Sequence, residues 1–312
     1  MEIIEVNAAA FGEIIPEPYY TFGSAEFAGL NSDKAETVHY LLFKDGKYRL
    51  GLIGGLRENT FHSPFSAPFG GFVHLNENIK IAHIDQAIEL LSGWANESNI
   101  KAISVCLPPA IYRESFIAKQ INSFFRAGFA IGKIDLSYSF KLRNFDKNYL
   151  EHIWRNARKN TRIALEQNMD FKKCESEEEK RLAYDIVRKN REAKEFPLRM
   201  SWEQVRNTTR LIQADFFLGY TEDNEPISSA IIFHVSAQIV QVIYWGDIAN
   251  TTVNKAMNFL AYKVFEYYKT QDTKIIDIGP STEDSIPNQG LCEFKESIGC
   301  DIHPKITLIK KL

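Results

Sequence analysis

Two apolar segments late in the chain, residues 238–247 and 274–278, carry at their ends side chains that could perform acid–base chemistry. These end residues are Tyr244, Trp245, Asp247, Asp277, Gly279 and Ser281. A carboxylate can accept a proton or hold an ammonium group, and a phenol can protonate a leaving atom. Burial in an apolar strand disfavours the charged form of a carboxyl group, so Asp277 is a candidate base. We therefore take Asp277 and Asp247 as candidate bases or ammonium anchors and Tyr244 as a candidate acid.

The elements that must position these residues can be read from the hydrophobic pattern. Residues 238–245 (QIVQVIYW) are β-branched or aromatic with few polar groups, which is typical of an interior strand. Residues 252–269 carry an apolar stripe at helical spacing, and residues 274–278 form another short apolar run. A strand, a helix and a strand in this order predict a right-handed crossover and a parallel pair. In open sheets ligands bind beyond the carboxyl ends of such strands, and here those ends carry the candidate residues.

Structural roles remain open for the same residues. Tyr244 and Trp245 could pack under a loop, because both side chains have an apolar body and a polar tip. Asp247 could cap the helix predicted after it. Asp277 could be a hydrogen-bonded structural group. The sequence by itself does not choose between these alternatives.

Composition limits the classes of protein that the chain can belong to. Its 312 residues suggest two domains, and its net charge of −3 argues against a broad nucleic-acid or membrane surface but not against a local basic groove. The four cysteines lack metal-type spacing, so we expect reduced thiols and no metal. Neither a secretory signal nor an apolar run long enough to span a membrane is seen. We expect a soluble, cytoplasmic protein with no tightly bound cofactor.

The two halves of the chain share one order of expected elements: three strands, a helix, a strand, a helix and a strand. Residues 101–105 and 127–129 recur at nearly equal offsets as residues 274–278 and 298–300. A repeat of this kind suggests structural duplication, although any two α/β domains could share such runs. We expect an N-terminal domain over residues 1–145 and a C-terminal domain over 146–312. We place each domain in the α/β class, with an α+β arrangement: a mixed, mostly antiparallel sheet that has a parallel central pair and is flanked by helices.

This order of elements resembles the acyl-CoA N-acyltransferase (GNAT) fold, and two such domains in tandem resemble the Fem-type peptidoglycan aminoacyltransferases and the wider FemAB-like group. Three segments carry the resemblance. Residues 154–168 are similar to the basic helix that opens the second domain of these proteins. Residues 291–299 (LCEFKESIG) are similar to their closing L-x-x-F-K-x-x-x-G segment. Residues 63–71 resemble the Ser-Pro…Gly-Gly element of their first domain.

The resemblance implies substrate-binding roles for residues in all three segments and beside the predicted strands. These candidates are Phe294, Lys295, Trp245, Ser281, Arg155, Arg158, Arg162, Ser63, Gly70 and Gly71. The basic residues between 155 and 162 lie on one helical face, which suits phosphate groups, including those of tRNA, but could equally be a solvated surface. Lys295 would contact a substrate phosphate or carboxylate, the alternative being an exposed helix lysine. The Pro/Gly element at 63–71 could bind a ligand or only shape a wall.

The resemblance also implies an activity: transfer of an acyl or aminoacyl group to an amine, by direct attack and without a covalent intermediate. CoA-dependent members of this fold cradle the pyrophosphate in a Gly-rich loop after the central strand. This chain has Trp245-Gly-Asp-Ile-Ala-Asn-Thr there, with one glycine and an acid. The donor therefore stays open between acyl-CoA and aminoacyl-tRNA, and the acceptor would be a small or peptide-like amine. The alternative is a non-catalytic ligand-binding protein that keeps the fold without a CoA site.

Overall fold

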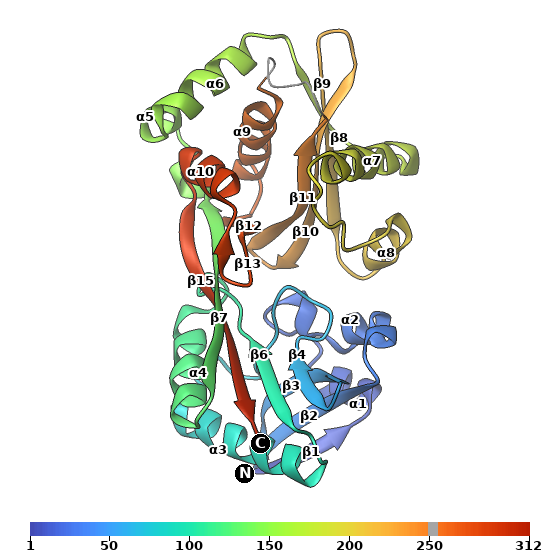
Figure 1. Ribbon diagram of the computed structural model, residues 1–312, viewed down its shortest axis with the longest axis vertical. Coiled ribbons are helices and arrows are strands. Elements are labelled where there is room, and N and C mark those ends of the chain that lie inside the picture. The colour runs from blue at the N-terminus through green and yellow to red at the C-terminus, as the bar shows by residue number, and fades with distance from the viewer. Residues whose placement is uncertain (249–254) are drawn as a thin grey trace. The chain divides into compact units, whose positions relative to one another are not determined.

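The computed structural model describes residues 1–248 and 255–312 and forms two compact units (Figure 1). Unit 1 comprises Met1–Leu136 with two late segments, Thr282–Ile286 and His303–Leu312. Unit 2 comprises Ser137–Ser281 and Pro287–Ile302. The division does not follow a single cut in the chain, because the two late segments fold with the first half.

Unit 1 is a mixed sheet with helices packed on it. Its elements are β1 (Glu2–Val6), α1 (Ala8–Ile14), α2 (Ala25–Leu30), β2 (Thr37–Asp45), β3 (Lys47–Arg57), β4 (Thr60–Ser63), β5 (Val73–His74), α3 (Ile81–Glu97), β6 (Ala102–Cys106), α4 (Glu114–Arg126), the first part of β7 (Ala130–Lys141), β13 (Thr282–Glu283) and most of β15 (Asp301–Lys311). The strand order is β1-β2-β3-β4-β6-β15, with β4 and β6 parallel. Its core gathers large buried side chains, among them Phe43, Phe61, Phe72, Phe124 and Leu308.

β2 and β3 form an antiparallel hairpin. The Pro/Gly-rich stretch that follows is part strand and part loop. Residues 60–63 form β4, which is paired on both sides and is therefore not an edge strand, and residues 64–72 form a loop outside the sheet.

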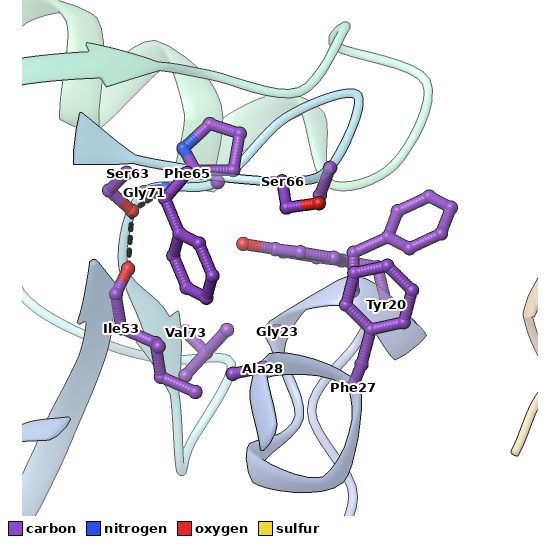
Figure 2. Close-up of a pocket in the computed structure, with 14 residues that line it drawn as sticks. Tyr20, Gly23, Phe27, Ala28, Ile53, Ser63, Phe65, Ser66, Gly71 and Val73 are labelled. Carbon is purple, nitrogen blue, oxygen red and sulfur yellow. Dashed lines mark hydrogen bonds between the residues drawn. The ribbon is translucent and has the colours of Figure 1, made fainter. Parts of the chain in front are cut away.

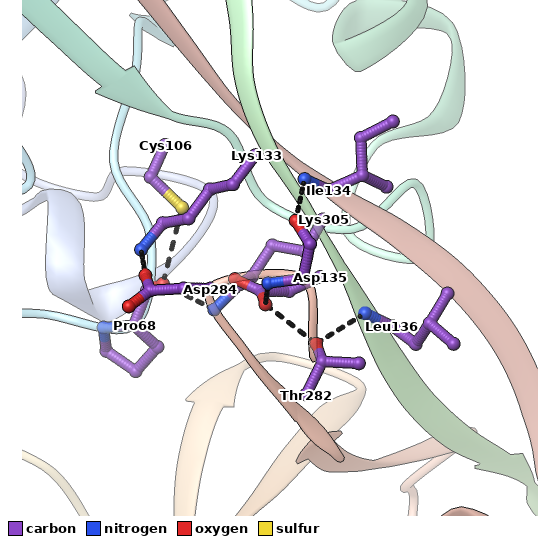
Figure 3. A network of polar contacts seen from close by, with 10 residues as sticks. Pro68, Cys106, Lys133, Ile134, Asp135, Leu136, Thr282, Asp284 and Lys305 are labelled. Carbon is purple, nitrogen blue, oxygen red and sulfur yellow. Dashed lines mark hydrogen bonds and ion pairs between the residues drawn. The ribbon is translucent and has the colours of Figure 1, made fainter. Parts of the chain in front are cut away.

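The short segment around β13 joins unit 1 through polar contacts with the start of β7 (Figure 3). Asp135 Oδ1 accepts hydrogen bonds from Thr282 Oγ1 at 2.7 Å and from the Ser285 backbone N–H at 3.1 Å. Lys133 Nζ forms an ion pair with Asp284 Oδ1 at 2.8 Å. These contacts, together with the pairing of β15 with β6, explain why residues late in the sequence belong to the first unit.

Unit 2 is a second mixed sheet. Its elements are the remainder of β7, α5 (Tyr149–His152), α6 (Arg155–Leu165), β8 (Asp170–Lys173), α7 (Glu177–Ala193), α8 (Trp202–Thr208), β9 (Ala214–Tyr220), β10 (Pro226–Ser236), β11 (Ile239–Asp247), α9 (Ala256–Lys269), β12 (Ile275–Pro280) and α10 (Gln289–Ser297), and β14 (Ile286–Pro287) lies at its boundary. The strand order is β7-β12-β11-β10-β9-β8, so β11 is an interior strand, as predicted.

Helices cover both faces of the sheet in unit 2. Successive side chains of a strand point to opposite faces. On β9, Phe216 contacts Trp202 of α8, whereas the next residue, Phe217, contacts Tyr268 of α9. Ser229 of β10 donates a hydrogen bond to the carbonyl of Ala183 in α7 at 2.7 Å. The fold is therefore a mixed α/β architecture in which the predicted helix–strand crossover positions β12 beside β11.

The predicted helix and the basic helix differ in extent from the sequence-based expectation. The basic segment at 154–168 forms α6 over Arg155–Leu165 only. The predicted helix at 252–269 is observed as α9 from Ala256 on, and residues 252–254 lie outside the described residues.

Candidate functional site

The predicted parallel pair is present, and its two strands separate at their carboxyl ends. β11 and β12 pair through Ile239–Ile275, Val240–Ile276 and Gln241–Asp277. Within residues 1–248 and 255–312, no further pair joins them, although β11 runs to Asp247 and β12 to Pro280. Each strand keeps its outer partner, since Asp247 pairs with Ser228 of β10 and Pro280 with Ser137 of β7. We call the separation beyond Gln241 and Asp277 the β11–β12 fork.

Two β-bulges accompany the fork. In β11 the register with β10 skips Ile243, and in β12 the register with β7 skips Ile278. A bulge bends its strand and increases the local twist. Gly279, directly after the second bulge, has φ +72°, a conformation that glycine adopts without the usual steric penalty. The bulges lie one and two residues beyond the last parallel pair, which is where the strands part.

Asp277 lies at the base of the fork and is fully buried. Its Oδ2 accepts a hydrogen bond from Gln241 Nε2 at 2.8 Å, and its Oδ1 accepts one from the Gly279 backbone N–H at 2.8 Å. Gln241 Oε1 is buried and has no hydrogen-bond partner in the part of the chain that the structure describes. Gln241 is not among the predicted site residues. Its sequence signal is that it is a polar residue inside an apolar interior strand.

Lys295 of α10 points into the protein and is only 3% exposed, so it is not an exposed helix lysine. Its Nζ donates to the carbonyl oxygens of Ile278 at 3.1 Å, Gly279 at 2.9 Å and Pro280 at 3.0 Å. Burial disfavours the ammonium form and lowers the pKa of Lys295 to about 8. Lys295 therefore ties α10 to the end of β12. Contact between Lys295 and a substrate stays a prediction.

Tyr244 and Trp245 lie on β11 beyond the last parallel pair and are both largely buried. The Tyr244 hydroxyl accepts a hydrogen bond from the Met200 backbone N–H at 3.1 Å, and burial raises its pKa. The Trp245 ring packs edge-on against Phe294 of α10, with ring centroids 5.9 Å apart. Both side chains are thus packed against other residues, which is the structural alternative that the sequence left open for them. The predicted acid and substrate-binding roles remain predictions.

Asp247, at the end of β11, is held by α7. Asn190 Nδ2 donates to the Asp247 carbonyl at 2.6 Å and to its Oδ1 at 3.2 Å, and Lys194 Nζ lies 3.8 Å from the same oxygen. α9 is described from Ala256, after Lys255, and residues 249–254 lie outside the described residues, so the capping role of Asp247 stays a prediction.

Ser281 follows the end of β12 and is 3% exposed. Its carbonyl accepts hydrogen bonds from the Asn288 backbone N–H at 2.9 Å and from Cys292 Sγ at 3.8 Å. Its hydroxyl is buried without a partner among the described residues. Asp277, Lys295 and Ser281 thus lie on the β12 side of the fork, whereas Tyr244, Trp245 and Asp247 lie on the β11 side.

The basic helix is α6, and its charge is partly neutralised. Glu151 of α5 pairs with Arg158 at 2.6 Å and with Arg162 at 2.8 Å. Glu151 precedes the basic stretch, so counting charges within that stretch missed it. Arg155 and Lys159 form no ion pair with any described residue. They are the two cations of this face left for an anionic partner.

The Pro/Gly loop of unit 1 lines a pocket with about 380 Å³ of empty space, its open mouth included (Figure 2). Ser63, Gly70 and Gly71, which the resemblance implicated, all contribute to it. Ser63 Oγ donates to the Ile53 carbonyl at 2.7 Å and accepts from the Gly71 backbone N–H at 3.1 Å. The other walls are mainly apolar and include Tyr20, Phe22, Phe27, Phe65 and Val73.

Neither a metal site nor a membrane-spanning helix is found among the described residues. Over residues 1–248 and 255–312, no group of three or more His, Cys, Asp or Glu side chains could hold a metal ion. In that same part of the chain, none of the helices combines the length and the apolar character that crossing a membrane requires.

Comparisons with known proteins concern the fold. No family model and no curated protein matches the chain. The crystal structure of FemX matches 100% of this chain and 98% of its own, with a TM-score of 0.71 at 13% identity. The C-terminal domain of a putative lysylphosphatidylglycerol synthetase from Agrobacterium fabrum matches 98% of this chain and 93% of its own, with a TM-score of 0.62 at 10% identity. A tandem GNAT protein from the clavulanic acid biosynthesis pathway matches 99% and 98%, with a TM-score of 0.50 at 9% identity. This chain thus has a tandem-GNAT fold that resembles the Fem-type proteins.

Proposed function

We propose that this protein transfers an acyl or aminoacyl group to an amine at the β11–β12 fork. The observation that carries the proposal is the separation of the two parallel strands after the pair Gln241–Asp277. Where a strand leaves its neighbour, backbone N–H groups on that side lose their ladder partners. An acyl carbonyl that enters the fork can accept a hydrogen bond from such a group.

In the proposed reaction, the acceptor amine attacks the donor carbonyl and forms a tetrahedral intermediate, whose oxygen becomes negatively charged. A backbone N–H of β11 in the fork donates to this oxygen. One such donor is worth about 3 to 4 kcal/mol in acyl transfer. Collapse of the intermediate forms the amide and releases the alcohol or thiol of the donor, while the amine loses a proton.

Asp277 is our candidate for holding the acceptor ammonium or taking its proton. It is a buried carboxylate at the base of the fork, held by Gln241 and by the Gly279 backbone. Lys295 acts as a positioning residue in this scheme, because its three hydrogen bonds fix the carbonyls of residues 278–280. Tyr244 is the candidate proton donor to the leaving atom.

We favour an aminoacyl ester of tRNA over acyl-CoA as the donor. The segment after β11 has one glycine and Asp247, which would repel a pyrophosphate placed beside it. Arg155 and Lys159 on α6 offer charge for a polynucleotide. The similarity in fold to FemX agrees with this choice, and the acceptor we propose is a small or peptide-like amine.

The test is to incubate the purified protein with panels of aminoacyl-tRNAs and acyl-CoAs and with amine acceptors, and to detect the amide by mass spectrometry. We expect product with at least one aminoacyl-tRNA, and a loss of product with Asp277→Asn. If no donor gives product but one compound class raises the unfolding temperature, the protein is a binding module. The absence of the glycine-rich loop is the feature that favours this second candidate.

A further inference from the structure

Arg191, in the last turn of α7, is a partly buried cation without a counter-ion. Its guanidinium carbon lies 5.8 Å from the centre of the Phe196 ring and 6.0 Å from the centre of the Tyr244 ring. Its Nε is buried and has no hydrogen-bond partner, and its side chain has no ion pair with any described residue. The same helix carries two arginines that are paired in the ordinary way: Arg181 with Asp185, and Arg188 with both Asp185 and Glu192.

Leaving Arg191 unpaired is unfavourable. A buried polar group without a hydrogen bond destabilises the folded state, and a buried charge without a partner does so more strongly. Burial accordingly lowers the pKa of Arg191. The two aromatic rings offset only part of this, because a cation–π contact contributes about 0.5 to 2 kcal/mol. An arginine held in this way has donors ready for an anion, since no described residue supplies one.

The position of Arg191 relates it to the fork. Tyr244 and Trp245 are successive residues of β11, so their side chains point to opposite faces of the sheet. Tyr244 contacts Arg191 of α7, whereas Trp245 contacts Phe294, the residue before Lys295 on α10. The partly buried Arg191 and the buried Lys295 therefore lie on opposite sides of β11 where it leaves β12.

Nearby acids do not satisfy Arg191. Asp247 is held by Asn190, the residue before Arg191, and lies 3.8 Å from Lys194. Asp277 is bonded to Gln241 and to the Gly279 backbone. Neither acid pairs with Arg191 among the described residues, so its guanidinium remains available to an anion.

We propose that Arg191 binds an oxyanion of the ligand that enters the β11–β12 fork, either a phosphate or a carboxylate. The planar guanidinium can donate two parallel hydrogen bonds to such a group. The flanking rings of Phe196 and Tyr244 hold the guanidinium plane in place before the ligand arrives. That the ligand is a substrate of acyl transfer rests on the proposed function, whereas the anion site itself does not.

The test uses Arg191→Gln, which removes the charge, and Arg191→Lys, which keeps the charge but loses the two-pronged geometry. Arg188→Gln is the matched control, because Arg188 lies on the same helix and is already paired. Binding of inorganic phosphate, pyrophosphate and acetate is measured by calorimetry and thermal unfolding, with sodium chloride added to hold the ionic strength constant.

We expect saturable binding of at least one of these anions to the unmodified protein and to Arg188→Gln. Arg191→Gln should weaken it at least tenfold, and Arg191→Lys should weaken it by less. Without an anion, Arg191→Gln should unfold at the same temperature as the unmodified protein or at a higher one. Preference for phosphate or pyrophosphate over acetate would assign the site to a phosphorylated ligand, and the reverse preference to a carboxylate.

Two outcomes would overturn the inference: no saturable binding of any of these anions to the unmodified protein, or binding that Arg191→Gln leaves unchanged. A fall in the unfolding temperature of Arg191→Gln with anion binding intact would assign Arg191 a purely structural role. Anion binding lost in Arg191→Gln, in a protein that forms no amide, would keep this inference and reject the proposed function. Amide formation by Arg191→Gln with unchanged KM for donor and acceptor would keep the proposed function and reject a role for Arg191 in binding its substrates.

Discussion

Lys295→Met should change how the stability of the protein depends on pH. Burial lowers the pKa of Lys295 from its ordinary 10.5 to about 8. Between these two values the unfolded chain holds a proton on Lys295 that the folded protein has released. Stability rises with pH wherever the unfolded state binds more protons. Lys295 should therefore add to the stability of the folded protein between pH 8 and pH 10.5, and this contribution should be absent from Lys295→Met.

The size of the effect follows from the two pKa values, because one pH unit corresponds to about 1.4 kcal/mol. The difference in unfolding free energy between the unmodified protein and Lys295→Met should shift by about 3 kcal/mol between pH 8 and pH 10.5. Below pH 8 the ammonium is charged in both states, so the difference should be constant there. Near pH 8 both forms of Lys295 are populated in the folded protein, so any activity that depends on its three hydrogen bonds should change in that range.

The assay is chemical denaturation of both proteins at closely spaced pH values, with Lys189→Met as the control, since Lys189 is exposed on α7. Groups remote from both substituted lysines cancel in the differences. If the difference in unfolding free energy from the unmodified protein varies with pH as little for Lys295→Met as for Lys189→Met, the ammonium of Lys295 is not desolvated. In that case its assignment as a buried link between α10 and β12 is wrong.

Three further predictions concern other parts of the chain. Asp277→Asn should reduce transfer by at least about 100-fold if Asp277 acts as the base, with little loss of stability; wild-type rates in Asp277→Asn would make the residue structural. Gly71→Ala should destabilise unit 1 by about 1 to 3 kcal/mol in thermal unfolding, because Gly71 has φ +92° and a Cβ there would lie 2.6 Å from Leu107 Cδ2. In the control Gly29→Ala, the added Cβ meets no atom within 4 Å, so this variant should be as stable as the unmodified protein or more stable. Arg155→Gln should reduce by about one the slope of log affinity for tRNA against log salt concentration, and an affinity that does not vary with salt would exclude tRNA binding through α6.

The sequence was sufficient to predict the central architecture of unit 2. An interior strand, an amphipathic helix and a second strand follow one another in residues 238–278, and the crossover rule then requires a parallel pair. The separation of that pair could be expected only from the resemblance. Its local causes, the bulges at Ile243 and Ile278, leave no clear trace in the residue types, because both positions are isoleucine, a common strand residue.

Other features depend on long-range partners that a single sequence does not identify. The hydrophobic pattern identifies β15 as a strand but does not reveal that its partner is β6 in the first half of the chain. The sequence predicts Lys295 as a substrate ligand or an exposed residue, because its three acceptors are backbone carbonyls and carry no residue-specific signal. Arg191 did leave a signal that was missed: it lies at helical spacing from the buried residues Tyr184 and Val187, on the apolar face of α7.

Ligand binding where β11 leaves β12 can be followed by hydrogen–deuterium exchange with mass spectrometry on adding an aminoacyl-tRNA that gives product. We expect slower exchange in β11 beyond Gln241 and around Gly279, with little change in the paired residues 239–241. If protection is confined to other elements and exchange beyond Gln241 is unaltered, the ligand does not bind at the fork.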